Sequence, residues 1–348
     1  MAGPSSFRTP TPPVTHRQWR PRAVFGSIDL GTNNCRMLVG APTSHGFQVL
    51  DSYSRVVRLG EGLYETGRLS PKAMDRAIAS LTICAARARR WSSGGLKLRA
   101  VATEACRQAE NGHEFVRQAR EATGLPLEII NPREEAELAV ESCTSLLRRA
   151  GRRAVLFDIG GGSTEIAWVR LDQDEQPRLI GYLSVPVGVV TLSERCGDAC
   201  YEPEGFTRLV QDMMARLQPF EDVHRIGEEI RRGDVAMLGT SGTVTTLAGV
   251  SLNLDRYRRG RVDGVSLTRP AVDEVLAYTR ALGREGLCRH PCIGQDRVEF
   301  VLPGCAIFTA IHELWRAPAL TIADRGLREG MLMRLMRGMP SPRSRSFP

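Results

Sequence analysis

Short apolar runs alternate with helical periods through the first half of the chain. Apolar runs bounded by turn-forming glycine, asparagine and serine predict strands, and apolar residues at three- and four-residue spacing predict helices. The predicted strands are 23–29, 35–39, 49–59, 98–102 and 127–130. The predicted helices are 70–91, 111–124 and 131–149. A β-meander followed by alternating strands and helices is typical of an α/β fold.

The second half repeats this opening. A strand from residue 154 runs into a glycine turn and a second strand at 165–171, as in the first meander. A later strand at 234–238 leads into another small-residue turn and a helix through residue 250. Closing helices are expected at 302–315 and 324–336. Two such halves predict two similar domains that face one another across a cleft.

Composition and charge fit an ordinary globular protein, with 42% hydrophobic and 25% charged residues among 348. The formal charge of +8 comes from residues 1–22 and 334–348, which hold eight arginines and no acid, while the remainder has 39 basic and 39 acidic residues. Because the body is neutral, no dedicated nucleic-acid domain is expected. The best local candidate for a polyanion track is the arginine cluster at 256–261.

The ends of the chain and its cysteines indicate where in the cell the protein is located. Both tails are rich in Pro, Ser and Arg, and we expect them to be disordered because they hold little apolar surface. The N-terminus lacks the apolar core of a signal peptide, and no run of about 18 apolar residues occurs, so we expect a cytoplasmic protein with no membrane partner. Nine cysteines without a C-x-x-C pair fit reduced thiols.

A zinc site is a weaker alternative for some of these cysteines. Cys196 and Cys200 are spaced as ligands could be, and so are Cys288, His290 and Cys292. Buried or merely tolerated thiols are much commoner than a split zinc site, so thiols without a metal are the preferred interpretation.

Three small-residue turns follow predicted strands. Residues 29–34 read Asp-Leu-Gly-Thr-Asn-Asn, and residues 158–165 read Asp-Ile-Gly-Gly-Gly-Ser-Thr-Glu. Glycine leaves backbone N–H groups bare and permits φ > 0, so these turns can close around phosphate oxygens. The third turn, 239–243, precedes a helix N-terminus, which favours anions. The predicted phosphate-binding residues are Gly31, Thr32, Asn33, Gly160, Gly161, Gly162, Ser163, Thr164, Gly239, Ser241, Gly242 and Thr243.

Carboxylates beside the first two turns predict a metal ion. Asp29 and Asp158 precede the turns, where Mg²⁺ that bridges to phosphate would lie. A single aspartate would more often accept hydrogen bonds in its own turn. Because the Asp-aliphatic-Gly pattern occurs twice, metal binding becomes the preferred interpretation, and Glu165 adds a third carboxylate. The predicted cofactor is therefore Mg²⁺, with Asp29, Asp158 and Glu165 as its ligands.

A candidate general base lies at the start of the helix expected after Asn131. Acidic residues are favoured there by the helix dipole, and Glu134 could form a capping box with Asn131. Glu135 points about 100° further round the helix. It is free to orient a water, and the helix start is expected to keep it ionised. Arg107, after strand 98–102, suits either bidentate phosphate contact or a surface ion pair.

Signatures of several other enzyme classes are missing from the sequence. It has no Walker A lysine motif, no G-x-G-x-x-G after a strand and no His-Asp dipeptide of an added hydrolase domain. Six segments instead resemble the Ppx/GppA phosphatases, which are exopolyphosphatases and guanosine pentaphosphate phosphohydrolases. The segments are 29–34, 102–109, 130–138, 158–165, 239–247 and 324–330. The resemblance runs from about residue 23 to 337 and matches the short two-domain form.

The resemblance implies an α/β fold of the actin, Hsp70 and sugar-kinase type. Two domains of ribonuclease H-like repeats would enclose an interdomain cleft. The implied boundaries are a disordered tail at 1–22, domain I at 23–142 with a return helix at 320–337, domain II at 143–319, and a disordered tail at 338–348.

The resemblance also implies Mg²⁺-dependent release of terminal phosphate from linear polyphosphate. The family's general base falls on Glu135 and its phosphate-binding arginine on Arg107. Its metal-associated carboxylates fall on Asp158 and Glu165. Two residues depart from the usual family pattern: Arg133 lies where a small or polar residue is common, and Asp263 lies where a histidine is frequent. These departures leave the substrate preference open.

Four functions remain open at this point. Exopolyphosphatase is the leading hypothesis, and a guanosine pentaphosphate phosphohydrolase would use the same chemistry, although nothing in the sequence identifies a guanine pocket. A non-catalytic sensor of alarmone or polyphosphate would not need Glu135. An ATP-driven kinase would need a base that faces an acceptor hydroxyl. The expected partners are inorganic polyphosphate or guanosine pentaphosphate, and a homodimer is an open option.

Overall fold

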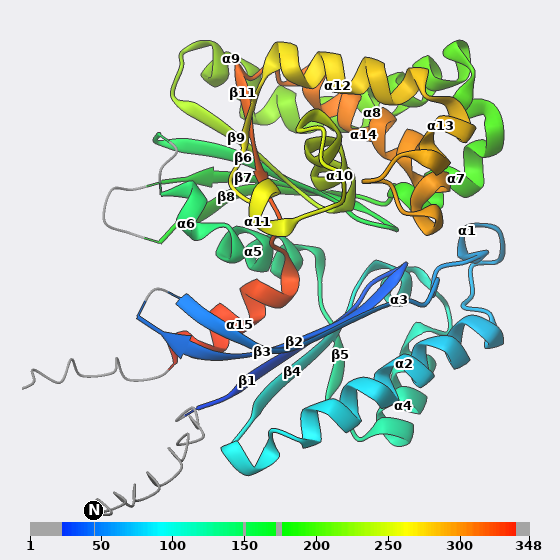
Figure 1. Ribbon diagram of the computed structural model, residues 1–348, viewed down its shortest axis with the longest axis vertical. Helices are drawn as coiled ribbons and strands as arrows, with labels where there is room; N and C mark the ends of the chain where they lie inside the picture. Colours follow the sequence, from blue (N-terminus) through cyan, green and yellow to red (C-terminus); the bar gives the residue numbers. More distant parts are fainter. Residues whose placement is uncertain (1–22, 45, 149–150, 172–175, 339–348) are drawn as a thin grey trace, which may run out of the picture.

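The computed structural model describes residues 23–44, 46–148, 151–171 and 176–338. The tail predicted at 1–22, nearly all of the tail predicted at 338–348, and the end of the helix predicted to reach 149 lie outside this part of the chain. The described chain forms two α/β lobes, the first below the second in Figure 1.

The strands and helices alternate as an α/β fold requires. The strands are β1 (Phe25–Leu30), β2 (Asn34–Thr43), β3 (Gly46–Val56), β4 (Lys97–Ala102), β5 (Leu127–Ile129), β6 (Arg153–Ile159), β7 (Thr164–Arg170), β8 (Arg178–Val185), β9 (Val235–Thr240), β10 (Ser266–Thr268) and β11 (Ala319–Ala323). The α-helices are α1 (Leu63–Thr66), α2 (Pro71–Arg89), α3 (Glu104–Gln108), α4 (Gly112–Thr123), α5 (Pro132–Ser142), α6 (Thr144–Leu147), α7 (Val189–Cys196), α8 (Pro203–His224), α9 (Ile226–Arg231), α10 (Gly242–Ser251), α11 (Arg259–Val262), α12 (Arg269–Ala281), α13 (Gly283–Arg289), α14 (Val298–Leu314) and α15 (Leu327–Arg337). The 3₁₀ helices are η1 (Ser92–Gly94), η2 (Gly197–Tyr201) and η3 (Gln295–Arg297).

The two sheets share an order of five strands, and the second sheet has β10 as an additional edge strand. The first has the order β3-β2-β1-β4-β5, and the second has the order β10-β11-β9-β6-β7-β8. In the first lobe β1 pairs antiparallel with β2 and parallel with β4. In the second lobe β6 pairs in the same way with β7 and β9. This matching order confirms the duplication expected from the two glycine turns.

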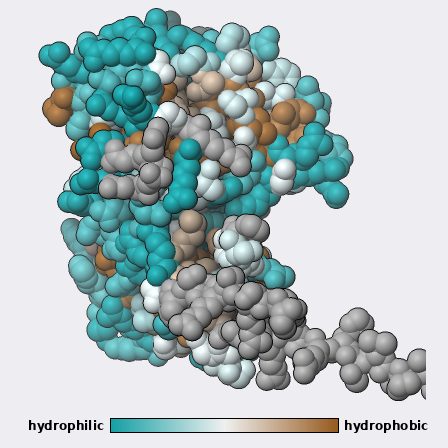
Figure 2. Space-filling model, turned by 90° about the vertical axis from the view of Figure 1, so that its left-hand side faces the viewer, coloured by the Kyte–Doolittle hydropathy of each residue, from teal (hydrophilic) through white to brown (hydrophobic). Residues whose placement is uncertain are grey.

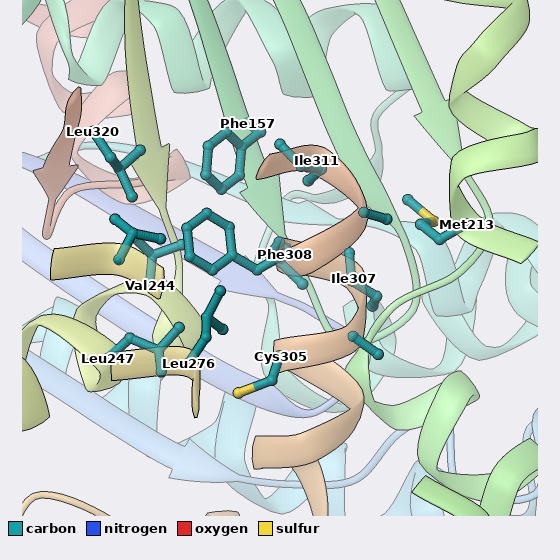
Figure 3. Packing of buried hydrophobic residues seen from close by; sticks show 14 of the residues in the cluster. Phe157, Met213, Val244, Leu247, Leu276, Cys305, Ile307, Phe308, Ile311 and Leu320 are labelled. Carbon is teal, nitrogen blue, oxygen red and sulfur yellow. The ribbon is translucent and has the colours of Figure 1, made fainter. Parts of the chain in front are cut away.

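Each sheet has a hydrophobic core on its outer face. In the first lobe α2 and α4 cover the sheet, and the buried residues include Leu81 and Phe115. In the second lobe the ring of Phe157 on β6 stacks on Phe308 of α14, with centroids 5.7 Å apart (Figure 3). These cores anchor the strands whose ends carry the glycine turns.

The helices α5 and α15 lie between the two sheets (Figure 1). The second sheet packs against α5 through a cluster that includes Ala139 and Leu156, while Leu138 of α5 and Met331 of α15 share another cluster with Val101 of the first sheet. Most exposed residues on the side shown in Figure 2 are hydrophilic, and its outline is indented between the upper and lower parts.

Three predicted elements differ from the structure. The return helix predicted at 320–337 is a strand and a helix, because the apolar β-branched run at 319–323 joins the second sheet and only α15 is helical. The helix predicted at 131–149 is interrupted at Cys143, between α5 and α6. The strand predicted at 49–59 ends at Val56, and two residues later Arg58 adopts φ 46°.

Candidate active site

A cavity of about 370 Å³ lies between the lobes, where the three small-residue turns converge. Both repeats contribute to its wall, as the duplicated turns predict. The predicted site residues that line the cavity are Asp29, Gly31, Thr32, Asn33, Glu135, Asp158, Gly160, Gly161, Gly162, Ser163, Glu165, Ser241, Gly242 and Thr243.

Three predicted residues do not line this cavity. Thr164 is fully buried at the start of β7, where its hydroxyl donates to the carbonyl of Val187 at 2.7 Å. Gly239 is a residue of β9 rather than of the turn, and a Cβ there would lie 2.5 Å from the Phe157 ring. Arg107 lies behind the wall, in contact with two carboxylates that do line the cavity.

The first two turns are closed by equivalent hydrogen bonds. Gly31 N–H donates to the carbonyl of Asn34, and Gly160 N–H donates to the carbonyl of Ser163, each at 2.9 Å. The strand registers then place Asp29 opposite Arg36 and Asp158 opposite Glu165. The repeats therefore present a carboxylate beside a guanidinium in one lobe and two carboxylates in the other.

Close approach, rather than left-handed backbone, explains the glycines of the triple-glycine turn. None of Gly160, Gly161 and Gly162 has a positive φ, contrary to the expectation for this turn. A Cβ on Gly162 would lie 2.4 Å from Oγ1 of Thr32, and the Cβ position of Gly161 is 3.2 Å from Thr32 Cβ. The turns of the two lobes thus touch each other, and larger residues would force them apart.

Two polar atoms in the cavity wall lack hydrogen-bond partners among the described residues. They are Oδ1 of Asn33 and Oγ of Ser241, both buried and both on residues that line the cavity. Ser241 precedes α10 with φ 108°, a left-handed conformation that costs energy in a non-glycine residue. Because buried polar atoms are normally satisfied, this pair indicates a ligand that completes the site.

Glu135 is held at the start of α5 by local capping. Oδ1 of Asn131 accepts from the N–H of Glu134 at 2.9 Å, and Pro132 occupies the first turn. Burial raises the pKa of Glu135 to about 7, against the opposing effect of Arg107. The helix start does not keep the group ionised as expected, because desolvation outweighs it. A pKa near neutrality suits a general base.

The neighbouring Glu134 is excluded from this site. Its carboxylate pairs with Arg99 at 2.7 Å and with Arg334 at 3.1 Å, away from the residues that line the cavity. The reciprocal bond of the expected capping box is replaced by these ion pairs. Of the two adjacent acids, therefore, only Glu135 faces the cavity.

Arg107 contacts Glu135 directly. Its Nη1 donates to Oε2 of Glu135 at 2.6 Å and to the carbonyl of Ile130 at 3.0 Å. Its Nε and Nη2 donate to Oε2 of Glu104 at 2.9 and 2.6 Å. Bidentate phosphate contact, one of the roles expected of Arg107, would require two donors to leave these partners.

The carboxylates of the turns crowd one another. Burial raises the pKa of Asp29, and it raises the pKa of Asp158 to about 6, which Arg36 opposes. Burial also raises the pKa of Glu165 well above its usual range, and repulsion from Glu135 and Asp158 adds to this. The hydroxyl of Ser163 donates to Oε1 of Glu165 at 2.6 Å. A bound cation would relieve this accumulation of negative charge.

Three arginines of the cavity wall are not among the site residues predicted from the sequence. Arg36 belongs to β2, Arg297 to η3 and Arg328 to α15. Neither Arg36 nor Arg297 has an ion-pair partner within the described ranges. Burial lowers the pKa of Arg297 and of Arg328, and Arg36 lowers both further. Guanidiniums that crowd one another in this way are suited to bind an anion.

The internal repeat could have identified Arg36. It follows Asp29 by seven residues, as Glu165 follows Asp158, so it occupies the equivalent position of the repeat. Arg328 lies in the segment 324–330 noted in the sequence, whereas Arg297 comes from a segment that no pattern marks.

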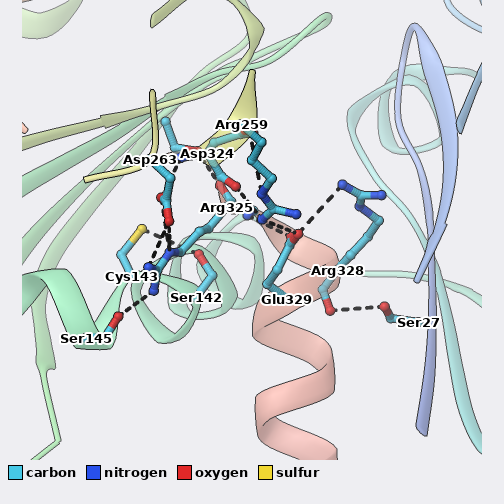
Figure 4. Close-up of polar contacts among 12 residues, drawn as sticks. Ser27, Ser142, Cys143, Ser145, Arg259, Asp263, Asp324, Arg325, Arg328 and Glu329 are labelled. Carbon is cyan, nitrogen blue, oxygen red and sulfur yellow. Dashed lines mark hydrogen bonds and ion pairs between the residues drawn. The ribbon is translucent and has the colours of Figure 1, made fainter. Parts of the chain in front are cut away.

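A polar network joins the lobes beside this cavity (Figure 4). Arg325 donates to both carboxylate oxygens of Asp263, and its Nη1 donates to Ser145. The buried carboxylate of Glu329 accepts from Arg259 at 3.0 Å and from the N–H of Gly326. The network connects α11 with the start of α15, and Asp263 is one of its anchors.

The arginine cluster at 256–261 is only partly available to a polyanion. Arg258 pairs with Asp255 at 2.9 Å, and Arg259 is held by the network of Figure 4. The predicted track is therefore reduced to Arg256 and Arg261, whose side chains are exposed.

The donor set fits Mg²⁺ better than zinc. Across the described ranges, no three His, Cys, Asp or Glu side chains are grouped so that they could hold a metal ion. The zinc alternative therefore has no support there, and the predicted ligands Asp29, Asp158 and Glu165 do not form such a three-carboxylate group either. Mg²⁺ usually binds one or two carboxylates and completes its shell with water and phosphate oxygens. Asp158, Glu165 and the unpartnered Oδ1 of Asn33 are oxygen donors of this kind.

The helices of the described segments have too little length or apolar character for a membrane span. None of them could cross a bilayer.

Known proteins resemble the chain in sequence and in structure. A relative from Haemophilus influenzae, an exopolyphosphatase by inference, is 30% identical over 314 residues, which cover 89% of this chain and 91% of the relative. The solved PPX-GPPA enzyme of Aquifex aeolicus is 26% identical with a TM-score of 0.73, over 90% of this chain and 99% of that one. A Cytophaga hutchinsonii exopolyphosphatase structure, 21% identical over 91% and 99% of the two chains, shares the fold with a TM-score of 0.76.

The fold and the family follow from these likenesses. The Aquifex enzyme supports the α/β, actin-like architecture that the family resemblance implies. The sequence model of the Ppx/GppA phosphatase family matches residues 38–338. The chain therefore belongs to the Ppx/GppA phosphatase family and is a phosphatase hydrolase.

Proposed function

We propose that the protein is an exopolyphosphatase that hydrolyses the terminal phosphate of linear inorganic polyphosphate. The observation that carries this proposal is the position of Glu135, which has a pKa near neutrality and lines the same cavity as the glycine turns. Arg107 occupies its Oε2, whereas Oε1 accepts no hydrogen bond from the residues described. A water bound at Oε1 would face the phosphate-binding turns.

The chain's own residues supply binding and orientation. Backbone N–H groups of the turns at 31–34 and 160–163 would hold the terminal phosphate. Arg36 and Arg297 would bind the charges of the next phosphates, because neither has an ion-pair partner to give up within the described ranges. Mg²⁺ held by Asp158 and Glu165 would neutralise phosphate charge when bound.

Proton transfer to Glu135 would then complete the hydrolysis. The water oxygen forms a bond to the terminal phosphorus, and the bond from that phosphorus to the bridging oxygen breaks in line with it. The electron pair of the broken bond leaves on the shortened chain. The proton of the water passes to Oε1 of Glu135, so no covalent enzyme intermediate is needed.

The cavity wall explains why the site would need a cation. Seven carboxylates and four guanidiniums line it, a composition that would repel a polyanion without added positive charge. The name of the Haemophilus relative supports the choice of polyphosphate as the substrate.

A phosphate-release assay on the purified chain tests the proposal. Wild-type protein with Mg²⁺ should release phosphate from long-chain polyphosphate, and Glu135→Gln should lower kcat by about 10²–10⁴-fold. Glu134→Gln is the matched control, since it changes the adjacent acid, whose partners lie outside the cavity. Undiminished activity of Glu135→Gln would overturn the mechanism.

Guanosine pentaphosphate is the second candidate substrate. Tyr257 and Asp324 line the cavity, and the phenol donates to the carboxylate at 2.5 Å. The Tyr257 ring could stack on a guanine base, and the Asp324 carboxylate could accept hydrogen bonds from the N–H groups of that base. A higher kcat/KM for the nucleotide than for polyphosphate would favour this function. Tight binding of either compound without phosphate release would instead favour a sensor.

A further inference from the structure

Glu104 lies at the cavity wall but has no role in the proposed hydrolysis. It is the first residue of α3, directly after β4 and Thr103, and its side chain is only 8% exposed. Both carboxylate oxygens are occupied, because Oε2 accepts two bonds from Arg107 and Oε1 accepts from Gln108 at 2.8 Å. A buried carboxylate with three donors from its own helix is held in a single position.

The hydrogen bonds of Arg107 show that the Glu104 carboxylate fixes its orientation. A guanidinium has five N–H donors in a rigid planar fork. Two of them bind Glu104, one binds the carbonyl of Ile130 and one binds Glu135. Because the fork is planar, fixing the Nε and Nη2 edge on Glu104 also fixes the direction of Nη1, which is the atom that contacts Glu135.

Glu104 also contacts the opposite lobe. A Cβ on Gly162 would lie 3.2 Å from Cγ and 3.3 Å from Cβ of Glu104, so the glutamate stem rests against the triple-glycine turn. The same side chain therefore touches the phosphate-binding turn and orients the arginine that binds the base.

We infer that Glu104 is a positioning residue, which holds Arg107 so that Glu135 presents its free oxygen toward the triple-glycine turn. This inference rests on the proposed function for its kinetic consequence and on the contacts above for its structural one. Without Glu104, Arg107 would lose two of its four bonds, and its planar fork could turn away from Glu135. Glu104 itself would touch neither the substrate nor the attacking water.

The chain contains a matched control for this arrangement. On α4, Glu114 accepts from Arg117 three residues later and from Gln118 four residues later, the same spacing that Glu104 has with Arg107 and Gln108. That cluster is exposed, with 47% of the Glu114 side chain and 58% of the Arg117 side chain accessible, and it does not line the cavity. Glu114→Ala thus removes the same local pattern outside the site.

Kinetics of Glu104→Ala give the first test. We expect kcat for polyphosphate to fall at least about tenfold while KM changes less than about twofold. The reason is that removal of the Glu104 carboxylate would disturb the general base Glu135 rather than substrate binding. Glu104→Gln keeps a neutral acceptor for Arg107 and should restore kcat to within about threefold of wild type. Glu114→Ala should leave kcat and KM unchanged. A loss in Glu104→Ala that appears mainly in KM would overturn the inference.

A double-mutant cycle separates positioning from general support of the fold. In an Arg107→Ala background, the further change Glu104→Ala should alter kcat by less than about twofold, because Glu104 would act only through Arg107. Independent, multiplicative losses from the two changes would show that Glu104 acts by another route.

A crystal structure of Glu104→Ala tests the inference without any assay of activity. Arg107 Nη1 should move beyond hydrogen-bonding distance of Glu135, more than about 3.5 Å away. An unchanged contact would overturn the positioning role even if polyphosphatase activity were established. A displaced arginine in a protein without that activity would sustain the positioning role and reject the proposed function.

Discussion

Arg58 and Glu299 form an ion pair from one lobe to the other, with Nη2 and Oε1 2.7 Å apart. Glu299 adjoins Phe300, a residue of the cavity wall. The backbone N–H of Arg58 donates to the carbonyl of Asn33, in the first phosphate turn, at 3.0 Å. Nearby, the N–H of Gly62 donates to Glu194 of α7 at 3.0 Å. The segment after β3 therefore connects the first turn to the second lobe.

Loss of this pair should weaken substrate binding by favouring an open cleft. The two side chains are 42% and 41% exposed, so the pair should contribute about 0.2–1 kcal/mol. Arg58→Ala should therefore raise KM about one-and-a-half- to fivefold with little change in kcat. Arg68→Ala removes an exposed pair with Glu110 within the first lobe and serves as the control. If Arg58→Ala still raised KM in a Glu299→Ala background, the ion pair would not be the cause.

Stability should depend on pH through the buried carboxylates. Burial raises the pKa of Glu165, so between pH 4.5 and that raised pKa the folded state binds more protons than the unfolded state. Its contribution to the free energy of unfolding then falls as pH rises. Without Mg²⁺, the melting temperature of Glu165→Gln should exceed that of wild type by a margin that grows from about pH 5 to about pH 8.

Calorimetry with and without Mg²⁺ checks this prediction. A bound cation should stabilise the wild-type carboxylates and narrow the margin at about pH 8. Glu274→Gln changes an exposed acid of α12 and should produce no such margin. If the Glu165→Gln margin shrank with rising pH in the absence of metal, the raised pKa of Glu165 could not be the source of the pH dependence.

A side chain on the triple-glycine turn should separate the two lobes. The Cβ of Gly162→Ala would lie 2.4 Å from Thr32 Oγ1, so Thr32 or the turn must shift. We expect a loss of about 1–3 kcal/mol in the free energy of unfolding and a higher KM. The control is Gly294→Ala, since Gly294 has φ −67° and no described atom lies within 4 Å of its Cβ position. Chemical denaturation of both variants and of the wild type measures the change in the free energy of unfolding.

Local sequence predicts the turns and their carboxylates well, because a hairpin and its flanking strands are determined by neighbouring residues. Asp29 and Asp158 lie at the strand ends where the pattern puts them, and both face the cavity. Asn131 likewise marks the helix start that positions Glu135. Whether these residues bind metal and transfer protons stays a prediction.

Contacts between distant segments could not be read from the sequence. Arg107 has suitable chemistry for phosphate, and only the three-dimensional positions of Glu104 and Glu135 show that its donors are occupied. Helix-dipole reasoning favours an ionised Glu135, whereas burial between the lobes raises its pKa. The strained backbone of Ser241 also has no signal in a turn that reads as glycine-rich.

Arg36 offers a prediction that links substrate and metal binding. It lines the cavity, and its charge favours the ionised forms of Asp29 and Asp158 against the burial that raises the pKa of each. Arg36→Met removes the charge and keeps much of the stem. We expect KM for polyphosphate to rise about tenfold or more, since the charge-assisted hydrogen bond proposed for Arg36 would be lost. Half-saturation should need less Mg²⁺, because the Arg36 charge repels a divalent cation more strongly than the proton that competes with it for a carboxylate. Arg55→Met, on the exposed part of the neighbouring strand β3, should change neither value. A rise in KM with an unchanged Mg²⁺ requirement would show that Arg36 acts on the substrate alone.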